Sequence, residues 1–166
     1  MRPSWKRADR PLLALACALV ALLPSAAPAA AATASDPGAF ARAMLRELNR
    51  ARAGRHLPAV REDGRMDHGA YGHSRDMARR GYFAHGSWPG RVMAAAGSAR
   101  SVGEVIGWRV QSSPAGEARG MVRDWLGSPP HRQVLLSAGF SRIGIGRATA
   151  SSGGHPTALY TVDWAG

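Results

Sequence analysis

Four residues near the C-terminus, Ile143-Gly144-Ile145-Gly146, constrain the fold more strongly than any other stretch. The alternation of isoleucine with glycine predicts a β-strand with large apolar side chains on one face and only hydrogen atoms on the other. Another element of the fold can therefore come close to the glycine face. The segment is not a phosphate-binding loop, because Thr149 occupies the position of the third glycine and no helix follows.

The residues before this strand predict a short helix. Ser128 can accept hydrogen bonds from the free N–H groups of a helix start, Pro129 suits the first helical position, and Gly139 can end the helix. His131 falls in the first turn, where those N–H groups and the helix dipole disfavour a charged ring. A neutral imidazole suits a metal ligand or a general base, although His131 can equally well satisfy only its own turn.

The rest of the sequence predicts four further helices and two further extended segments. Apolar residues recur at the helical period, and Asp36-Pro37 and Gly54 frame the first helix. The expected helices cover about 36–53, 66–80, 89–96 and 117–126, with a polar loop at 111–116. β-Branched and alternating residues favour extended structure at 101–110 and 157–164. A turn at 149–156 would join the last strand to the strand near Ile143 as a hairpin.

The first 34 residues have the order of a secretory signal peptide. A positively charged start precedes the apolar run Leu12–Leu23, and Ala32-Thr33-Ala34 offers small residues for cleavage. The run is too short to span a bilayer, which takes about 20 apolar residues. Cys17 lies in the middle of the run, which disfavours a lipid anchor on that cysteine. We expect a signal peptide at 1–34 and one secreted domain at 35–166.

The expected mature domain contains no cysteine, so it has no disulfide, no cysteine nucleophile and no cysteine metal site. Its 18 arginines outnumber its 10 acidic residues, which gives a net charge of +8. Such a surface favours an anionic cell-envelope polymer or lipid, whereas export argues against nucleic acid. A solvated basic surface without a specific partner is the simpler alternative. We expect a monomer, without a transmembrane segment in the mature chain.

Three histidines and one acid in the middle of the chain bear on function. His68 and His73 are five residues apart on one helix and so point about 140° apart, which excludes a shared metal. His73 lies on the apolar stripe and is interpreted as a packing residue. His85 lies in an irregular segment, where functional residues concentrate. Glu104 lies among apolar residues, so it either pairs with an arginine or is functional.

Six short motifs occur in a fixed order along the chain. They are Leu48-Asn49-Arg50-Ala51-Arg52, Asp76-Met77-Ala78, Tyr82-Phe83-Ala84-His85, Gly103-Glu104, Trp125-Leu126-Gly127-Ser128-Pro129-Pro130-His131-Arg132 and Ile143-Gly144-Ile145-Gly146. No single motif is specific, but the ordered set resembles the CAP superfamily, also called the SCP domain, in its bacterial secreted form. The resemblance covers about residues 38–166.

The resemblance implies an α+β fold, a three-layer α-β-α sandwich with a small, mainly antiparallel central sheet. It also implies a cavity lined by two histidines and two acids, which in some members binds a divalent metal such as zinc. Matched residue by residue, the cavity histidines are His85 and His131, and the first acid is Glu104. On this basis His85 and His131 are the expected metal ligands.

Two positions depart from the family pattern. Ser128 stands where the second acid falls in animal and plant members, and Val105 stands where asparagine usually follows the glutamate. Both departures weaken the expectation of metal binding. Glu117 and Asp124 are the alternatives for the missing acid.

The resemblance favours a non-catalytic extracellular or envelope binding module, because most family members have no established enzyme activity. The sequence agrees, since Ser87 lacks the spacing of a serine nucleophile. The alternative is a metal-assisted, peptidase-like hydrolase that uses His85, Glu104 and His131.

Overall fold

The computed structural model describes residues 38–166, so the expected signal peptide and the Asp36-Pro37 cap lie outside the described residues. Five helices and four strands occur in this part of the chain. They are α1 (Ala39–Ala53), β1 (Arg61–Glu62), α2 (Gly64–Arg80), α3 (Trp88–Ala96), β2 (Val102–Val110), α4 (Pro114–Gly127), α5 (Pro129–Leu135), β3 (Arg142–Ser152) and β4 (His155–Ala165).

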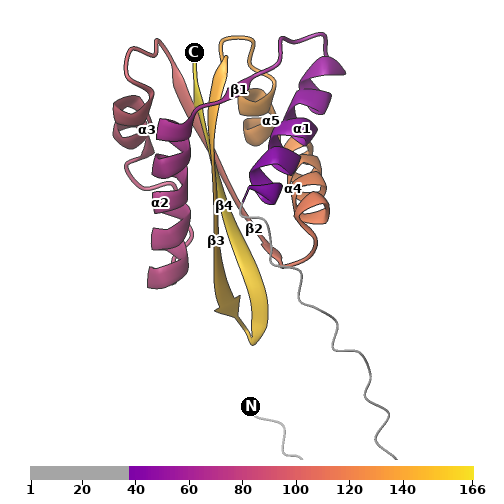
Figure 1. Cartoon of the computed structure of the whole chain (residues 1–166), viewed down its shortest axis with the longest axis vertical. Coiled ribbons are helices and arrows are strands. Elements are labelled where there is room, and N and C mark those ends of the chain that lie inside the picture. Colours follow the sequence, from indigo (N-terminus) through magenta and orange to yellow (C-terminus); the bar gives the residue numbers. More distant parts are fainter. Residues whose placement is uncertain (1–37) are drawn as a thin grey trace, which may run out of the picture. The chain divides into compact units, whose positions relative to one another are not determined.

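The four strands form one sheet in the order β1-β3-β4-β2. β4 pairs antiparallel with both β3 and β2, and only the two-residue β1 runs parallel to its neighbour β3. Helices α2 and α3 cover one face of the sheet, and α1, α4 and α5 cover the other (Figure 1). The predicted α+β fold, a three-layer sandwich around a mainly antiparallel sheet, is therefore confirmed.

Helix α2 lies directly on the glycine face of β3. A Cβ atom added to Gly144 would lie 2.2 Å from the carbonyl carbon of Met66, and one added to Gly146 would lie 2.2 Å from the carbonyl carbon of Ala70. Beside this contact, the Oγ of Ser74 donates to the Oγ1 of Thr161 on β4 at 2.9 Å. The close approach expected from the alternating glycines is thus made by a helix backbone, which fixes where α2 lies along the sheet.

The larger core lies on the opposite face, between the sheet and helices α1, α4 and α5. Its largest buried side chains are those of Trp125, Trp164 and Tyr160. Arg52 of α1 is also fully buried there, and it has no acidic partner among residues 38–166. Its guanidinium donates to the backbone oxygens of Leu135 and Ser137, both at 2.9 Å, and to those of Pro58 and Phe140. Burial lowers the pKa of Arg52.

Three predicted boundaries are wrong. The helix after Ser128 ends at Leu135 and not near Gly139, because Arg52 binds the carbonyls that follow the last turn. Helix α4 begins at Pro114, inside the predicted loop 111–116, because the Oγ of Ser113 caps the N–H of Gly116. The turn predicted at 149–156 contains only the two residues between the end of β3 at Ser152 and the start of β4 at His155.

The tip of the hairpin consists of two glycines, Gly153 and Gly154, which have φ angles of 57° and 79°. Positive φ at both central residues is typical of the two-residue turn that matches the twist of paired strands. β3 and β4 therefore stay paired up to Ser152 and His155. Ser128 differs from the expectation in another way, since its side chain caps no backbone N–H group.

A side chain at Gly144 should destabilise the fold, because its Cβ would meet the backbone of α2 and not a flexible side chain. We expect Gly144→Ala to lower the free energy of unfolding by about 3 kcal/mol. The matched control is Gly72→Ala, which lies on α2 and has nothing within 4 Å of its added Cβ. The control should gain about 0.5–1 kcal/mol in urea unfolding. Equal stability of the two variants would contradict the close contact.

The pH dependence of stability should reveal the carboxyl of Asp67 on α2, which accepts the N–H of Ile145 at 2.7 Å. Burial raises the pKa of Asp67 to about 6, this hydrogen bond opposes the rise, and the charges of Glu62 and Asp63 add to it. Since the unfolded pKa is about 3.9, the folded state holds the proton more tightly. The stability contributed by this proton is full below pH ~4 and is lost as pH rises through ~6.

Asp67→Asn should therefore become progressively more stable than the wild type between pH ~4 and ~7 in urea unfolding, since the amide carries no charge. A stability difference that stays constant over this range would show that Asp67 is ionised at an ordinary pKa.

Candidate functional site

Two buried carboxylates lie side by side on the face of the sheet that α2 and α3 cover. Glu104 of β2 and Asp163 of β4 are directly opposite each other in the antiparallel register, so their side chains share one face. Both side chains are fully buried. Next to Asp163 on β3 stands Gly144, whose missing side chain makes room for α2.

Arg91 of α3 bridges the two acids. Its guanidinium donates to Oε2 of Glu104 and to both oxygens of Asp163, with an Nη2–Oδ1 distance of 3.1 Å. One guanidinium neutralises one carboxylate, and a second buried charge nearby is costly, so the pair retains a proton near neutral pH. Burial raises the pKa of Glu104 to about 8; Arg91 opposes the rise and Asp163 adds to it. Burial also raises the pKa of Asp163.

His85 is the second partner of Glu104. It lies in the segment between α2 and α3, and its Nδ1 is 2.6 Å from Oε1 of Glu104. The His85 side chain is 44% exposed, whereas that of Glu104 is completely buried. Burial lowers the pKa of His85, which favours the neutral ring. The contact fixes one ring nitrogen and leaves Nε2 without a protein partner among residues 38–166.

His131 lies in the first turn of α5, and its Nδ1 is 2.8 Å from the Oγ of Ser128. The serine thus binds the histidine three residues later and not the backbone, so the ring also satisfies its own turn. Burial lowers the pKa of His131, and the charge of His85 lowers it further. His131 makes no direct contact with Glu104 in the described structure.

His73 contributes to the site although its place on the apolar stripe indicated only packing. Its ring is buried on α2, and Nε2 lies 3.8 Å from Oε2 of Glu104 without any hydrogen-bond partner in residues 38–166. Burial lowers its pKa, and the positive charge of Arg91 lowers it further. The rings of His73 and His85, two acids and one arginine therefore lie together where β2, β4, α2 and α3 meet, and His131 of α5 makes no hydrogen bond or ion pair with them among residues 38–166.

Three features of this cluster were not predicted from the sequence: Arg91, Asp163 and this role of His73. Asp163 could have been noticed in the sequence, since it is an acid between the apolar Val162 and Trp164 of a buried strand. Its register opposite Glu104 depends on long-range pairing. Arg91 gives no signal among many scattered arginines.

Glu117 does not replace the missing second acid. It is buried on the opposite face of the sheet and is fully occupied by Arg147, by the hydroxyl of Tyr160 at 2.9 Å and by the N–H of Ser112. Asp124 pairs with Arg109 and Arg123. Neither contacts His85 or His131 in the described structure.

Two ring nitrogens, Nε2 of His85 and Nε2 of His131, have no hydrogen-bond partner among residues 38–166. The Nδ1 atoms of His85 and His131 each have a hydrogen-bond partner, Glu104 and Ser128, which orients the Nε2 atoms as metal-ligating histidines require. Within residues 38–166 no group of three or more His, Cys, Asp or Glu residues is arranged to hold a metal ion. Zinc normally takes four ligands, so solvent or a bound ligand would have to complete the shell.

The comparisons with known proteins agree with this fold. No curated protein matches the chain. An extracellular protein containing an SCP domain from Bacillus anthracis str. Ames is 26% identical, with a TM-score of 0.60 over 75% of this chain and 39% of that chain. A cysteine-rich secretory protein from Staphylococcus aureus is 14% identical, with a TM-score of 0.58 over 80% of this chain and 40% of that chain. This chain therefore spans about two fifths of either protein.

An outer surface protein from Borrelia burgdorferi is 16% identical, with a TM-score of 0.63 over 78% of this chain and 94% of that chain. At such identity the likeness shows the fold alone. The family assignment comes from the sequence, since the model of CAP, the cysteine-rich secretory protein family, matches residues 45–163, which is most of the chain. The chain therefore belongs to the CAP family.

Proposed function

We propose that this protein is a secreted, non-catalytic binding module that acts outside the cell or at the cell envelope. The N-terminal sequence supports export. The similarity of the chain to proteins described as extracellular or outer-surface proteins supports it as well. No helix within residues 38–166 is long and apolar enough to cross a membrane.

The occupied carboxylate of Glu104 carries the non-catalytic part of the proposal. A metal-assisted hydrolase would need this acid as a metal ligand or as a general base within reach of water. Here one oxygen contacts His85 and the other contacts Arg91, and the side chain is fully buried. The acid therefore acts on neighbouring side chains, orienting His85 and holding Arg91, and not on a ligand.

The metal site that we propose is formed by Nε2 of His85 and Nε2 of His131. The solved structure of NaASP2 with Zn²⁺, which is 11% identical to this chain, motivates zinc as the first ion to test. A bound zinc ion would polarise an oxygen of a bound ligand. The chain itself contributes two neutral rings, held by Glu104 and Ser128.

Calorimetry at neutral pH should detect one weak zinc site in the wild type. His85→Ala or His131→Ala should remove the heat of binding, because each variant leaves a single imidazole. His68→Ala, which removes an exposed histidine on α2, is the matched control and should bind as the wild type does. Equal heats from the wild type and the double variant His85→Ala/His131→Ala would refute the metal site.

The proposed partner at the envelope is an anionic polymer or lipid. The expected mature domain carries 18 arginines against 10 acidic residues, and several arginines of α2 lie exposed at the surface. Such an excess attracts polyanions at long range, and salt screens the attraction.

Co-sedimentation with purified cell envelopes should decrease as NaCl rises from about 0.05 to 0.5 M, since the screening length falls from about 14 to 4 Å. Arg75→Gln/Arg79→Gln removes two exposed positive charges from α2 and should lower the bound fraction at low salt. Binding that is independent of salt and of these charges would exclude a mainly electrostatic attachment.

A further inference from the structure

A hollow of about 280 Å³ lies beyond the C-terminal end of α2, away from the histidines described above. The hairpin of β3 and β4 extends past the last turn of this helix, so the end of the sheet is uncovered (Figure 1). Gly81, with a φ of 66°, ends α2 and turns the chain so that Tyr82 and Phe83 border the hollow. Leu159 and Trp108 are cross-strand partners and form its floor and wall.

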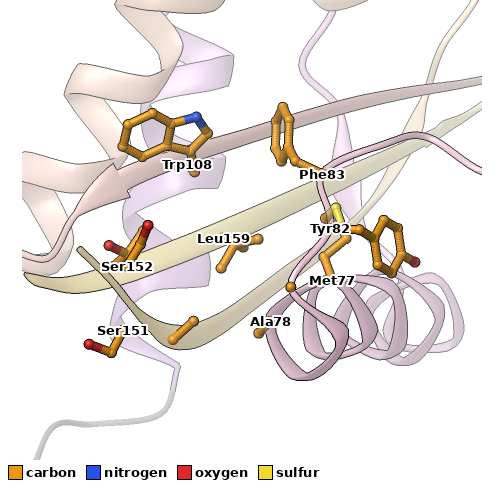
Figure 2. A pocket seen from close by; sticks show the side chains of 11 residues that line it. Met77, Ala78, Tyr82, Phe83, Trp108, Ser151, Ser152 and Leu159 are labelled. Atoms are coloured by element: carbon orange, nitrogen blue, oxygen red, sulfur yellow. The ribbon is translucent and has the colours of Figure 1, made fainter. Parts of the chain in front are cut away.

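Two aromatic side chains at this hollow are exposed, in contrast to the buried tryptophans of the core. Trp108 is 57% exposed and Phe83 is 48% exposed. Figure 2 shows both rings along one side of the hollow, with Leu159 at its middle and Ser151 and Ser152 at one end. A single exposed apolar side chain needs no explanation, but a group of them around a concave surface marks a binding site.

The lining of the hollow indicates an uncharged ligand. It contains no Asp, Glu, Lys, Arg or His, although arginine is abundant elsewhere in the chain. The hydroxyl of Tyr82 is already donated to Asp76 at 2.7 Å, which fixes that ring. The hydroxyl of Ser152, which lies on the same face of β3 as Ala150, has no protein partner among residues 38–166 and stays free to bind a ligand, whereas the side chain of Ser151 points to the opposite face.

We propose that this hollow binds one ring of a neutral saccharide. A pyranose has an apolar face of C–H groups that can stack on the exposed rings of Trp108 and Phe83, and hydroxyls at its edge that can bond to Ser152. The volume of about 280 Å³ is just below the range of about 300–1,000 Å³ that is usual for ligand pockets, and it therefore suits a single ring. A long acyl chain would leave the hydroxyl of Ser152 unpaired and most of its own length exposed.

The saccharide site uses different groups from the proposed metal and polyanion sites. Glu104 and Trp108 are four residues apart on β2, about 13 Å along the strand. Ile106 lies between them on β2, and its buried side chain packs against Met77 and Leu159, which line the hollow. Saccharide binding should therefore be insensitive to salt and to His85→Ala/His131→Ala, which separates its outcome from that of the proposed function.

The test is a titration of the purified protein with three neutral trisaccharides, tri-N-acetylglucosamine, cellotriose and maltotriose. Saturation-transfer NMR and tryptophan fluorescence report the binding. We expect at least one trisaccharide to bind, and Trp108→Ala to weaken it about tenfold or more, because the variant removes the larger stacking ring. Ser152→Ala should weaken it less, and Ser151→Ala, on the opposite face of β3, should leave it unchanged. Tyr71→Ala removes another exposed ring, on α2 and outside this hollow, and should leave binding unchanged.

Circular dichroism should show that Trp108→Ala is folded, as expected for a half-exposed side chain, and Phe83→Ala supplies an independent loss of stacking. Monomeric dihexanoyl-phosphatidylcholine is the competing apolar probe. The proposal is overturned if no trisaccharide transfers magnetisation at 10 mM, if binding is undiminished in both Trp108→Ala and Phe83→Ala, or if only the lipid binds at Trp108.

Discussion

The contact between the backbone of α2 and the glycine face of β3 is the constraint on which the rest of the structure depends. Side chains at Gly144 and Gly146 would occupy the space of Met66 and Ala70, so the helix is seated directly on the strand. This contact fixes the position of every other α2 residue relative to the sheet. His73 consequently lies over Glu104, and the end of α2 falls short of the hairpin tip.

Buried carboxylates are neutralised to different degrees on the two faces of the sheet. On the face covered by α1 and α4, Glu117 is satisfied completely by Arg147, Tyr160 and a backbone N–H group. Opposing effects act on its pKa: burial raises it, but these hydrogen bonds leave it below its ordinary value. That cluster is structural, because it has no unmet donor or acceptor capacity to offer a ligand.

On the other face, one arginine serves two acids and His73 keeps an unpaired nitrogen. Burial outweighs the stabilising contacts there, so the pKa of Glu104 rises to about 8. Unlike Glu117, this cluster reaches the surface through His85, the most exposed of its side chains in contact with Glu104. Incomplete neutralisation next to a partly exposed ring is what distinguishes a candidate binding site from a structural ion pair.

The sequence by itself determined the local features. Alternating glycines predicted the strand with one bare face, hydrophobic periodicity predicted the helices, and ordered motifs indicated the family and the residues His85, Glu104 and His131. These signals are local because they arise from backbone conformation and from side-chain periodicity along a single element. The predicted end of the helix after Ser128 was wrong because the helix ends at Leu135, whose carbonyl accepts a hydrogen bond from Arg52, 83 residues earlier in the chain.

Only the tertiary structure decided how the charges meet. Pairing of β2 with β4 brings Asp163 opposite Glu104, and packing of α3 on α2 brings Arg91 between them. The hollow at Trp108 likewise depends on where α2 stops relative to a hairpin about 70 residues further along the chain. Neither arrangement leaves a periodic trace in the sequence, because strand register and helix position are set by contacts between segments that are distant in the chain.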